Sequence, residues 1–265
     1  MIPAIEVSDL VKRFNGLTAV DGISFQVQTG ELFGFLGPNG AGKTTTINIL
    51  CTLLAPTSGT ASVAGFDSVS HPRQIRQSIG IIFQDPSLDE RLTAWENLEF
   101  HGMIYHMPKV IRRKRMQEVL NLVELSERKD SIVKTFSGGM KRRLEVARGL
   151  MHQPKILFLD EPTIGLDPQT RYRIWSTIDQ LRTQQQVTLF LTTHSMEEAS
   201  QCDRVAILDH GRLLALDGPQ NLVAQHHAKN LEEVFLKLTG KGLRDAEASE
   251  AEMSRTTVRR LKRWR

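Results

Sequence analysis

One glycine-rich loop constrains this chain more than any other part of its sequence. Residues 37–44 have the sequence Gly-Pro-Asn-Gly-Ala-Gly-Lys-Thr, which fits G-x-x-x-x-G-K-[ST], the Walker A phosphate loop. The short apolar run at 31–36 predicts a buried strand before the loop, and Ile47, Leu50 and Leu54 recur at helical spacing after it. The loop therefore lies between a predicted strand and a predicted helix, which is the context that phosphate binding requires.

The residue types in the loop follow from the chemistry of holding a phosphate. Glycines leave backbone N–H groups bare, and the N-terminus of the next helix adds free N–H groups and the positive end of its dipole. Lys43 supplies a mobile charge for the β- and γ-phosphates, and Thr44 supplies a hydroxyl ligand for Mg²⁺. We expect Lys43 to be exposed and to contribute little to packing. The residues expected to contact the phosphates are Gly37, Pro38, Asn39, Gly40, Ala41, Gly42, Lys43, Thr44 and Thr45.

Composition limits the classes of protein to which the chain can belong. Its 265 residues, of which 40% are hydrophobic and 24% charged, can bury one sizeable core with an inserted lobe. No apolar run approaches the ~18 residues of a membrane span, and the N-terminus lacks the pattern of a secretory signal. Cys51 and Cys202 lie in apolar patterns that favour buried free thiols in a reducing compartment.

The positive charge of the chain is concentrated at its C-terminus. Six of the last eleven residues are basic and none is acidic, and removing those six side chains changes the net charge from +4 to −2. A body this close to neutral argues against a nucleic-acid partner. We expect 245–265 to be a basic, disordered tail.

The first part of the chain alternates apolar and polar residues. Residues 5–28 predict antiparallel strands with turns at Asn15-Gly16 and Asp21-Gly22. Residues 57–60 are expected to close the helix after the phosphate loop, and 61–65 to form a short strand. A helix at 72–78 and a buried strand at 79–83 follow, and the strand ends at Gln84.

The pattern becomes helical after Gln84 and alternates again after residue 150. A capping box at Thr93 predicts a helix to about residue 107, and 110–125 predicts an amphipathic helix, so 86–150 is expected to be a helical insertion. The alternating strands and helices from 156 to 208 predict a parallel sheet. A hairpin is expected at His210-Gly211-Arg212, and two short helices beyond Pro219.

Two carboxylates follow the predicted strand at 156–159. A buried strand that ends in Asp at the carboxyl edge of a parallel sheet places the acid beside the phosphate-loop helix. Asp160 then fits the Walker B role of holding Mg²⁺, and Glu161 fits a general base. An exposed acidic turn is the alternative for these two residues alone, and the phosphate loop upstream disfavours it.

A second glycine-containing segment, Ser137-Gly138-Gly139, precedes a predicted helix at 141–151. Ser137 can cap this helix, and the glycines allow a ligand to approach its N-terminus closely. The pattern alone does not separate a helix start from a second phosphate site.

Taken together, these motifs resemble those of the ATP-binding-cassette (ABC) ATPases. The phosphate loop, Gln84, the segment 137–139, the acids at 160–161 and His194 occur in the order of that family. The segment Gly165-Leu166-Asp167 matches its D-loop, although Ile164-Gly165 replaces the commoner Ser-Ala. The resemblance covers about residues 4–220. The segments 136–140 and 231–240 further resemble the daunorubicin-resistance type of exporter ATPase subunit.

The resemblance implies roles for the residues outside the phosphate loop. Phe14, which considered alone is more readily explained as a core residue, would stack on adenine. Gln84 would sense the γ-phosphate and Mg²⁺, and His194 would contact the γ-phosphate. Ser137, with Gly138 and Gly139, would bind the γ-phosphate of ATP held by a second cassette, and Asp167 would link the two sites. The implied catalytic residues are Glu161, His194 and Gln84, and the implied Mg²⁺ ligands are Thr44, Gln84 and Asp160.

The resemblance also implies a fold and a function. The expected fold is α/β, a P-loop NTPase with a RecA-like core, an N-terminal antiparallel subdomain and the helical insertion, over 1–220, followed by a helical extension at 221–244. The expected function is ATP hydrolysis coupled to export through a separate permease, by an ATP-dependent head-to-tail homodimer or paired cassette at the cytoplasmic face of the cell membrane. An importer ATPase, or a non-transport ABC ATPase acting on ribosomes or DNA, is the alternative.

Overall fold

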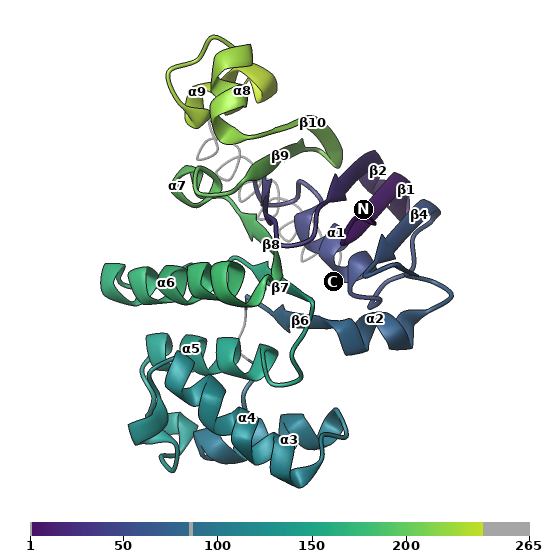
Figure 1. Ribbon diagram of the computed structural model, residues 1–265. Helices are drawn as coiled ribbons and strands as arrows, with labels where there is room; N and C mark the ends of the chain where they lie inside the picture. Colours follow the sequence, from purple (N-terminus) through teal and green to yellow (C-terminus); the bar gives the residue numbers. More distant parts are fainter. Residues whose placement is uncertain (1, 85–86, 241–265) are drawn as a thin grey trace, which may run out of the picture. The chain divides into compact units, whose positions relative to one another are not determined.

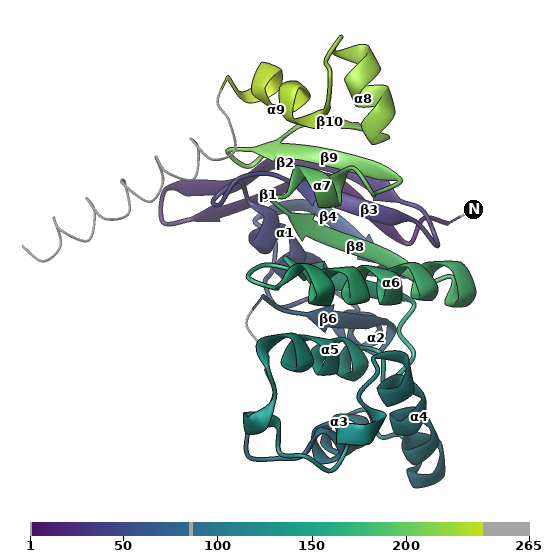
Figure 2. The same ribbon diagram turned by 90° about the vertical axis from the view of Figure 1, so that its left-hand side faces the viewer.

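The computed structural model, drawn in Figures 1 and 2, describes residues 2–84 and 87–240, which divide into two compact units. Unit 1 takes its described residues from Met1–Ile5, Val27–Glu31 and Ser62–Leu191. Unit 2 takes them from Glu6–Gln26, Leu32–Ala61 and Thr192–Arg265. The predicted tail at 245–265 lies outside the described residues.

The antiparallel strands at the N-terminus belong largely to unit 2. Strands β1 (Ile5–Phe14) and β2 (Leu17–Val27) are hydrogen-bonded neighbours. The turn predicted between them at Asn15-Gly16 is confirmed, and both residues have positive φ values, 37° and 90°, as a tight primed turn requires.

The turn predicted at Asp21-Gly22 is wrong, because both residues lie inside β2. Gly22 has a φ of 70°, so the strand bends there without reversing. The Asp21 N–H donates to the Gly211 carbonyl at 2.8 Å, and the Arg212 Nε donates to the Asp21 carboxylate at 2.8 Å. These two long-range contacts hold the bend, and local sequence gives no sign of them.

Unit 2 also holds the strand, loop and helix of the predicted phosphate site. Strand β3 (Leu32–Leu36) is entirely buried and runs parallel to β9 (Arg204–Asp209). The predicted hairpin at His210-Gly211 joins β9 to the antiparallel β10 (Arg212–Asp217). The predicted helix is α1 (Lys43–Leu50), which ends before Leu54. Short helices α7 (Met196–Ala199), α8 (Pro219–Gln225) and α9 (Leu231–Thr239) complete the unit.

Unit 1 contains the strand that ends at the predicted acids, together with its parallel neighbour. Strand β6 (Ile79–Ile82) is parallel to β7 (Ile156–Asp160), and β8 (Thr188–Thr193) is the next strand in the order. Helix α2 (Pro72–Ser78) precedes β6, and α6 (Pro168–Gln185) lies between β7 and β8 in the chain. Alternating strands and helices were predicted for this part, and the α/β class is confirmed.

A strand replaces the helix ending that the sequence predicted at 57–60. Strand β4 (Ser58–Val63) begins three residues earlier than expected and pairs antiparallel with β5 (Phe66–Asp67). Helix α1 has already ended at Leu50, so Ser58 and Thr60 belong to the strand.

Three helices of unit 1 form the predicted helical segment, and both ribbon views show them side by side (Figures 1 and 2). They are α3 (Ala94–Ile104), α4 (Lys109–Leu122) and α5 (Gly138–Gly149). The capping box predicted at Thr93 is present, since the Glu96 N–H donates to the Thr93 hydroxyl at 3.1 Å and the Thr93 N–H donates to the Glu96 carboxylate at 2.8 Å. Helix α3 ends slightly earlier than predicted.

Two further features concern the cysteines and the hydropathy of the helices. Cys51 and Cys202 are both buried, as expected. Among the described residues, no helix has the length and hydropathy of a membrane span.

An aromatic cluster joins α3 to the segment after α5. The Tyr105 ring stacks on the His152 ring with centroids 3.8 Å apart, and His101 lies 4.9 Å from Tyr105. The Ile79 carbonyl lies 2.7 Å from the His152 Nε2. Burial, aided by the charges of Arg148 and His152, lowers the pKa of His101 to about 3. Burial also lowers the pKa of His152.

These lowered pKa values predict that acid destabilises the protein. The folded state keeps His101 neutral, whereas the unfolded chain takes up a proton below its pKa of about 6.5, so stability is full above that pH and falls toward pH 3. Urea unfolding at about pH 7.5 and about pH 5.5 should show a loss of about 1 kcal/mol that comes from this residue. The His101→Gln variant should lack this component. Equal pH dependence in the native protein and the variant would contradict the assignment.

Candidate active site

The phosphate loop in unit 2 has little room for side chains. The Gly37 N–H donates to the Thr193 carbonyl at 3.3 Å, which fixes the start of the loop against the end of β8. A Cβ atom at Gly37 would lie 2.6 Å from the Leu208 carbonyl oxygen, and one at Gly42 would lie 2.5 Å from the Ala19 carbonyl oxygen. Gly42 also has a φ of 98°, and it serves as the N-cap of α1. Glycine at these positions is therefore a steric requirement of the loop.

The expectation that Lys43 would be exposed is wrong. Its side chain folds over the loop, where Nζ donates to the Gly37 carbonyl at 2.6 Å and to the Pro38 carbonyl at 3.0 Å. The residue is only 5% exposed as a result. Thr44 is exposed and Thr45 half-buried in the first turn of α1. The ammonium group is thus already held against the loop that is expected to bind phosphate.

The residue that fixes the end of β8 is Thr193, which sequence reasoning missed. Its hydroxyl accepts from the Ser195 N–H at 2.8 Å and donates to the Glu198 carboxylate at 2.5 Å. His194 lies between these anchored residues and is half-buried. Only the Ser and Thr types near a strand end could have suggested this arrangement.

Phe14, at the end of β1, is 41% exposed, so the alternative of a core residue is wrong. The Lys12 ammonium lies 5.0 Å from the centroid of its ring. An exposed aromatic face of this kind is available for stacking.

The two predicted acids lie in unit 1 at the carboxyl end of β7. Asp160 is the last residue of the strand and is 6% exposed, and Glu161 is 7% exposed. Glu161 has a φ of 47°, a left-handed conformation that non-glycine residues seldom adopt. The alternative of an exposed acidic turn is therefore excluded. Buried carboxylates and local backbone strain both concentrate at functional sites.

Arg142 of α5 organises this end of β7, and sequence reasoning missed it. Its guanidinium donates to the carbonyls of three successive residues, Asp160 at 3.1 Å, Glu161 at 3.2 Å and Pro162 at 2.7 Å. It also donates to the Phe83 carbonyl, immediately before Gln84. Arg142 is 5% exposed. One side chain thus joins α5, the segment that leads to Gln84 and the strained backbone at Glu161, while Gln84 itself is exposed.

Replacing Arg142 by methionine should destabilise the protein by about 3 kcal/mol, because buried carbonyl groups lose their donors. The loss should appear as a lower urea midpoint, with ATP turnover reduced as well, since the backbone around Glu161 loses its support. The matched control is Arg113→Met, which removes an exposed arginine from α4. Equal stabilities of the two variants would contradict the role given to Arg142.

The segment with Ser137 and Gly139 is packed against the start of α6. Ser137 caps α5 by accepting from the Met140 N–H at 3.2 Å. Asp167 caps α6, since its carboxylate accepts from the Thr170 N–H at 3.0 Å and from the Thr170 hydroxyl at 2.6 Å. These bonds hold the pKa of Asp167 below its usual value. A Cβ atom at Gly139 would lie 2.6 Å from the Thr170 hydroxyl oxygen. Thr170, also missed, therefore joins the two predicted segments.

The predicted residues divide between the two units. Unit 2 brings the phosphate loop together with the segment that carries His194, and it also holds Phe14. In unit 1, Arg142 connects Phe83, which precedes Gln84, to Asp160 and Glu161, and Thr170 lies between Gly139 and Asp167. The polar groups proposed as Mg²⁺ ligands all present oxygen, from Thr44, Gln84 and Asp160.

The oxygen ligands expected from Thr44, Gln84 and Asp160 suit a Mg²⁺ ion that is bound together with phosphate, rather than a metal site made of protein groups alone. Within the described ranges, no group of three or more His, Cys, Asp or Glu residues could hold a metal ion. Mg²⁺ in phosphate-transfer sites is characteristically held by one or two protein groups together with phosphate oxygens. The donor set therefore suits Mg²⁺ that arrives with a nucleotide.

Comparison with known proteins gives one family match and several relatives whose names agree with that family. The family described as "ABC transporter" matches residues 20–164. A Nod factor export ATP-binding protein I from Ralstonia nicotianae is 41% identical over 88% of this chain and 73% of its own length. The daunorubicin/doxorubicin resistance ATP-binding protein DrrA from Streptomyces peucetius is 46% identical over 80% of this chain and 64% of its own length. The linearmycin resistance ATP-binding protein LnrL from Bacillus subtilis is 40% identical over 91% of this chain and 76% of its own length.

The similar solved structures, like these relatives, are ATP-binding proteins. An ATP-binding subunit of an ABC transporter has a TM-score of 0.80 at 28% identity and covers 89% of this chain and 99% of its own. A dimeric ATP-binding cassette in a post-hydrolysis state, bound to ADP and Pi, has a TM-score of 0.73 at 26% identity and covers 81% of this chain and 98% of its own. The predicted P-loop NTPase fold is confirmed by this similarity.

Proposed function

This chain belongs to the ABC transporter family as an ATP-binding and ATP-hydrolysing subunit, and we propose that it powers export through a separate membrane permease. The observation that carries the proposal is the similarity to relatives that are named for export of Nod factor and for resistance to daunorubicin and linearmycin. We place the chain at the cytoplasmic face of the cell membrane, held there by the permease.

The residues of unit 2 would bind the ATP phosphates. The loop N–H groups between Gly37 and Lys43, and the start of α1, face the negative charge of the phosphates, and the Lys43 ammonium exchanges its loop carbonyls for phosphate oxygens. Phe14 stacks on the adenine ring. Thr44, Asp160 and Gln84 would hold the Mg²⁺ that arrives with the nucleotide, and the ion would supply positive charge to offset the charge of the phosphates.

Glu161 would act as the base in ATP hydrolysis. Glu161 accepts a proton from the attacking water as the water oxygen bonds to the γ-phosphorus and the bond from that phosphorus to the β-phosphate oxygen breaks, which leaves ADP and phosphate. His194 would orient the γ-phosphate. Arg142 holds the backbone of Glu161 in its strained conformation and so fixes the position of this base.

We further propose that ATP joins two copies of the chain head to tail. Ser137 and Gly139 of one copy would contact the γ-phosphate bound by Lys43 of the other, and Asp167 would connect the two sites. The dimeric cassettes among the similar solved structures support this arrangement. The Ser137 hydroxyl and the uncrowded Gly138, which has no atom within 4 Å of a built Cβ, lie at the exposed start of α5.

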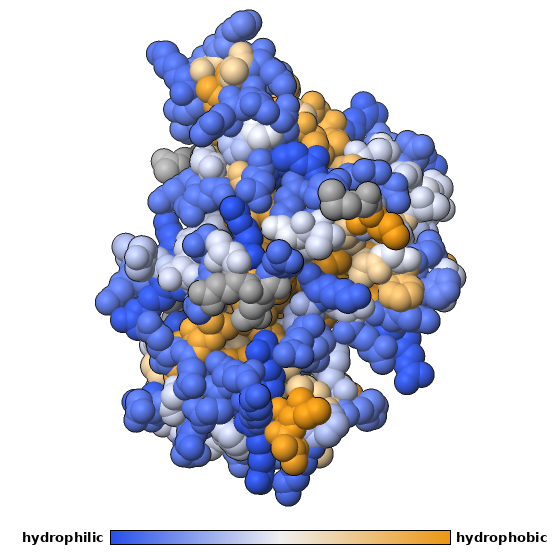
Figure 3. All heavy atoms as spheres, viewed as in Figure 1, coloured by the Kyte–Doolittle hydropathy of each residue, from blue (hydrophilic) through white to orange (hydrophobic). Residues whose placement is uncertain are grey.

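The surface that would meet the permease is an apolar patch on α3 and the start of α4, seen as orange side chains in Figure 3. Its residues are Phe100, Met103, Ile104, Val110 and Ile111, which are between 55% and 82% exposed. Beside it lies a hollow of about 230 Å³, lined in part by Phe100, Asn97 and Arg148. Exposed apolar patches next to a polar rim mark surfaces for protein partners.

The Phe100→Asp variant tests this proposal. A tagged chain, expressed in its own cells, should be recovered with the membrane fraction several-fold less when Phe100 is charged, because the apolar contact with the permease is lost. The matched control is Leu53→Asp, which charges an exposed apolar residue of unit 2. Equal membrane recovery of both variants and the native chain would refute docking through α3.

A further inference from the structure

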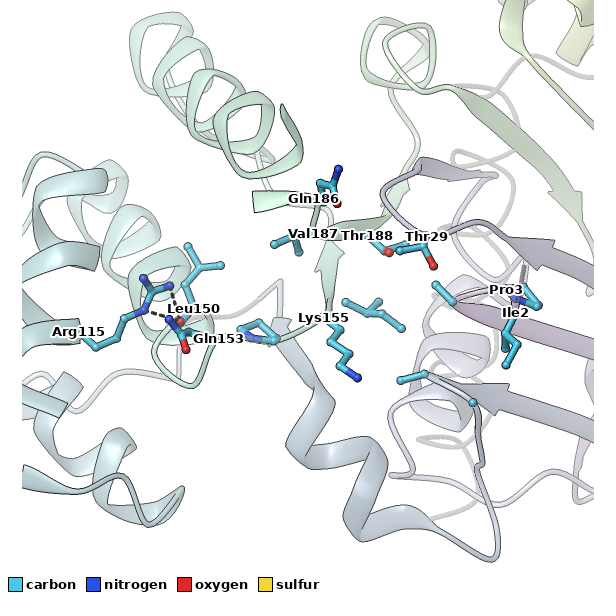
Figure 4. A pocket seen from close by; sticks show the side chains of 15 residues that line it. Ile2, Pro3, Thr29, Arg115, Leu150, Gln153, Lys155, Gln186, Val187 and Thr188 are labelled. Carbon is cyan, nitrogen blue, oxygen red and sulfur yellow. Dashed lines mark hydrogen bonds between the residues drawn. The ribbon is translucent and has the colours of Figure 1, made fainter. Parts of the chain in front are cut away.

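A large cleft in unit 1 lies at the end of β7 that is remote from the predicted acids (Figure 4). Its volume is about 800 Å³, and it opens beside Lys155 and Ile156 at the start of β7. The carboxylates at 160–161 follow the other end of the strand, and five residues of β-strand span about 16 Å. The cleft is therefore separate from the residues proposed to hydrolyse ATP.

Backbone hydrogen bonds tie together the segments that line one side of the cleft. The Ala64 N–H donates to the Ala4 carbonyl at 2.7 Å, which joins the N-terminal segment to the end of β4. The Thr188 N–H donates to the Lys155 carbonyl at 3.0 Å, and the Gly30 N–H donates to the Thr188 hydroxyl at 3.0 Å. Hydrogen-bonded segments from several parts of unit 1 therefore form this side of the cleft.

The other side is held by Arg115 of α4. Its Nε and one terminal nitrogen donate to the Leu150 carbonyl at 3.3 Å and 3.0 Å, contacts drawn as dashed lines in Figure 4. Leu150 is the C-cap of α5, the helix that begins at Ser137. The other terminal nitrogen donates to the Glu118 carboxylate at 3.1 Å. Arg115 therefore has a fixed position at this end of the cleft, and its charge is paired with that of Glu118.

The charged groups that line the cleft are all positive. Lys155 and Arg115 are the charged residues among its fifteen lining residues, and none of the fifteen carries a carboxylate. Lys155 is exposed, and Figure 4 shows its side chain extending between the two sides. The remaining lining mixes polar groups with apolar residues, of which Ile2 is exposed, Pro3 is half-buried, and Leu150 and Val187 are buried.

We propose that this cleft is a binding site for a small organic anion with an apolar body. The carboxylate, sulfonate or phosphate of such a molecule would pair with the Lys155 ammonium, and its apolar part would cover the apolar surface that Ile2 and Pro3 present to the cleft. A neutral apolar molecule would leave the Lys155 ammonium without a counter-charge, and a small inorganic anion would leave the exposed apolar surface of Ile2 in water. The volume suits a molecule of the size that typical ligand pockets accommodate.

The amphipathic sulfonate anilinonaphthalene sulfonate is a suitable probe, because its fluorescence rises when it binds in an apolar site. It should be titrated into the full chain with saturating ADP present, so that the nucleotide site is filled. The Lys155→Glu variant should bind about tenfold more weakly, since an attraction becomes a repulsion at close range. The Lys155→Arg variant should bind within about threefold of the native chain, because the charge is retained.

Three controls make the result specific to this cleft. The Lys134→Glu variant reverses an exposed lysine elsewhere in unit 1 and should bind like the native chain. The Thr29→Trp variant keeps Lys155 but fills part of the cleft from an exposed lining position, and it should also weaken binding. The uncharged analogue phenylnaphthylamine should be insensitive to Lys155→Glu. Native-like sulfonate binding by both Lys155→Glu and Thr29→Trp, or equal weakening by Lys134→Glu, would overturn the proposal. ATP hydrolysis is not a readout here, so the result is independent of the proposed export function.

Discussion

Replacing Glu161 by glutamine is expected to lower ATP turnover by a factor of about 10²–10⁴ while leaving ATP binding intact. The amide keeps the shape of the carboxylate and its capacity to accept a hydrogen bond, but it cannot take the proton of the attacking water. The side chain is 7% exposed at the end of β7, so bulk water cannot readily replace it as a base. Phosphate release at saturating ATP measures turnover, and binding of a fluorescent ATP analogue measures affinity.

The matched control for this variant is Glu232→Gln, which removes an exposed carboxylate from α9. It should hydrolyse ATP at the native rate. The Glu161→Gln variant should also accumulate as an ATP-bound dimer on a sizing column, because hydrolysis is the step that separates the copies. Native turnover by Glu161→Gln would show that another group acts as the base.

Replacing Lys43 by alanine is expected to remove most ATP hydrolysis and most of the stabilisation that ATP confers. A ligand at a hundredfold excess over its Kd stabilises a protein by about 2.7 kcal/mol, and this increment should largely disappear without the ammonium group. Thermal unfolding with and without ATP measures the increment. The variant should also be less stable without nucleotide, by about 1–3 kcal/mol, because Lys43 is buried and donates to the Gly37 and Pro38 carbonyls.

The Lys43→Arg variant separates these two effects. Arginine keeps a positive charge near the loop carbonyls but is larger and differently shaped, so it should preserve stability better than alanine without restoring native turnover. An undiminished ATP-dependent rise in melting temperature for Lys43→Ala would contradict the assignment of the phosphate loop.

The elements around the phosphate loop and the acids could be predicted because their signals are local. β3 and β7 are short apolar runs, and in the structure each is entirely buried. The capping box at Thr93 and the positive-φ turns at Asn15-Gly16 and His210-Gly211 depend on residues that are adjacent or three apart. In each case the interaction that defines the element lies within the window that a sequence pattern covers.

The interactions that could not be predicted join residues far apart in the chain. Arg142 donates to carbonyls eighteen to fifty-nine positions away, and nothing in its helix distinguishes it from the neighbouring arginines. The bend at Asp21-Gly22 depends on Gly211 and Arg212 in the same way. Lys43 is buried because its ammonium group donates to the Gly37 and Pro38 carbonyls. The direction of these carbonyls depends on the backbone conformation of the loop, which the residue types alone do not show.

The roles proposed for Ser137 and Lys43 require that one ATP be bound by two copies of the chain, and mixing two inactive variants tests this most directly. A Lys43→Ala chain and a Ser137→Arg chain should each form homodimers in which both sites are defective. A mixed dimer would hold one site with both defects and one site with neither. If one ATP is shared in this way, we expect ATP hydrolysis, absent from each variant alone, to return when the two are mixed. No recovery in samples in which mixed dimers are shown to form, or full activity in a strictly monomeric native chain, would contradict it.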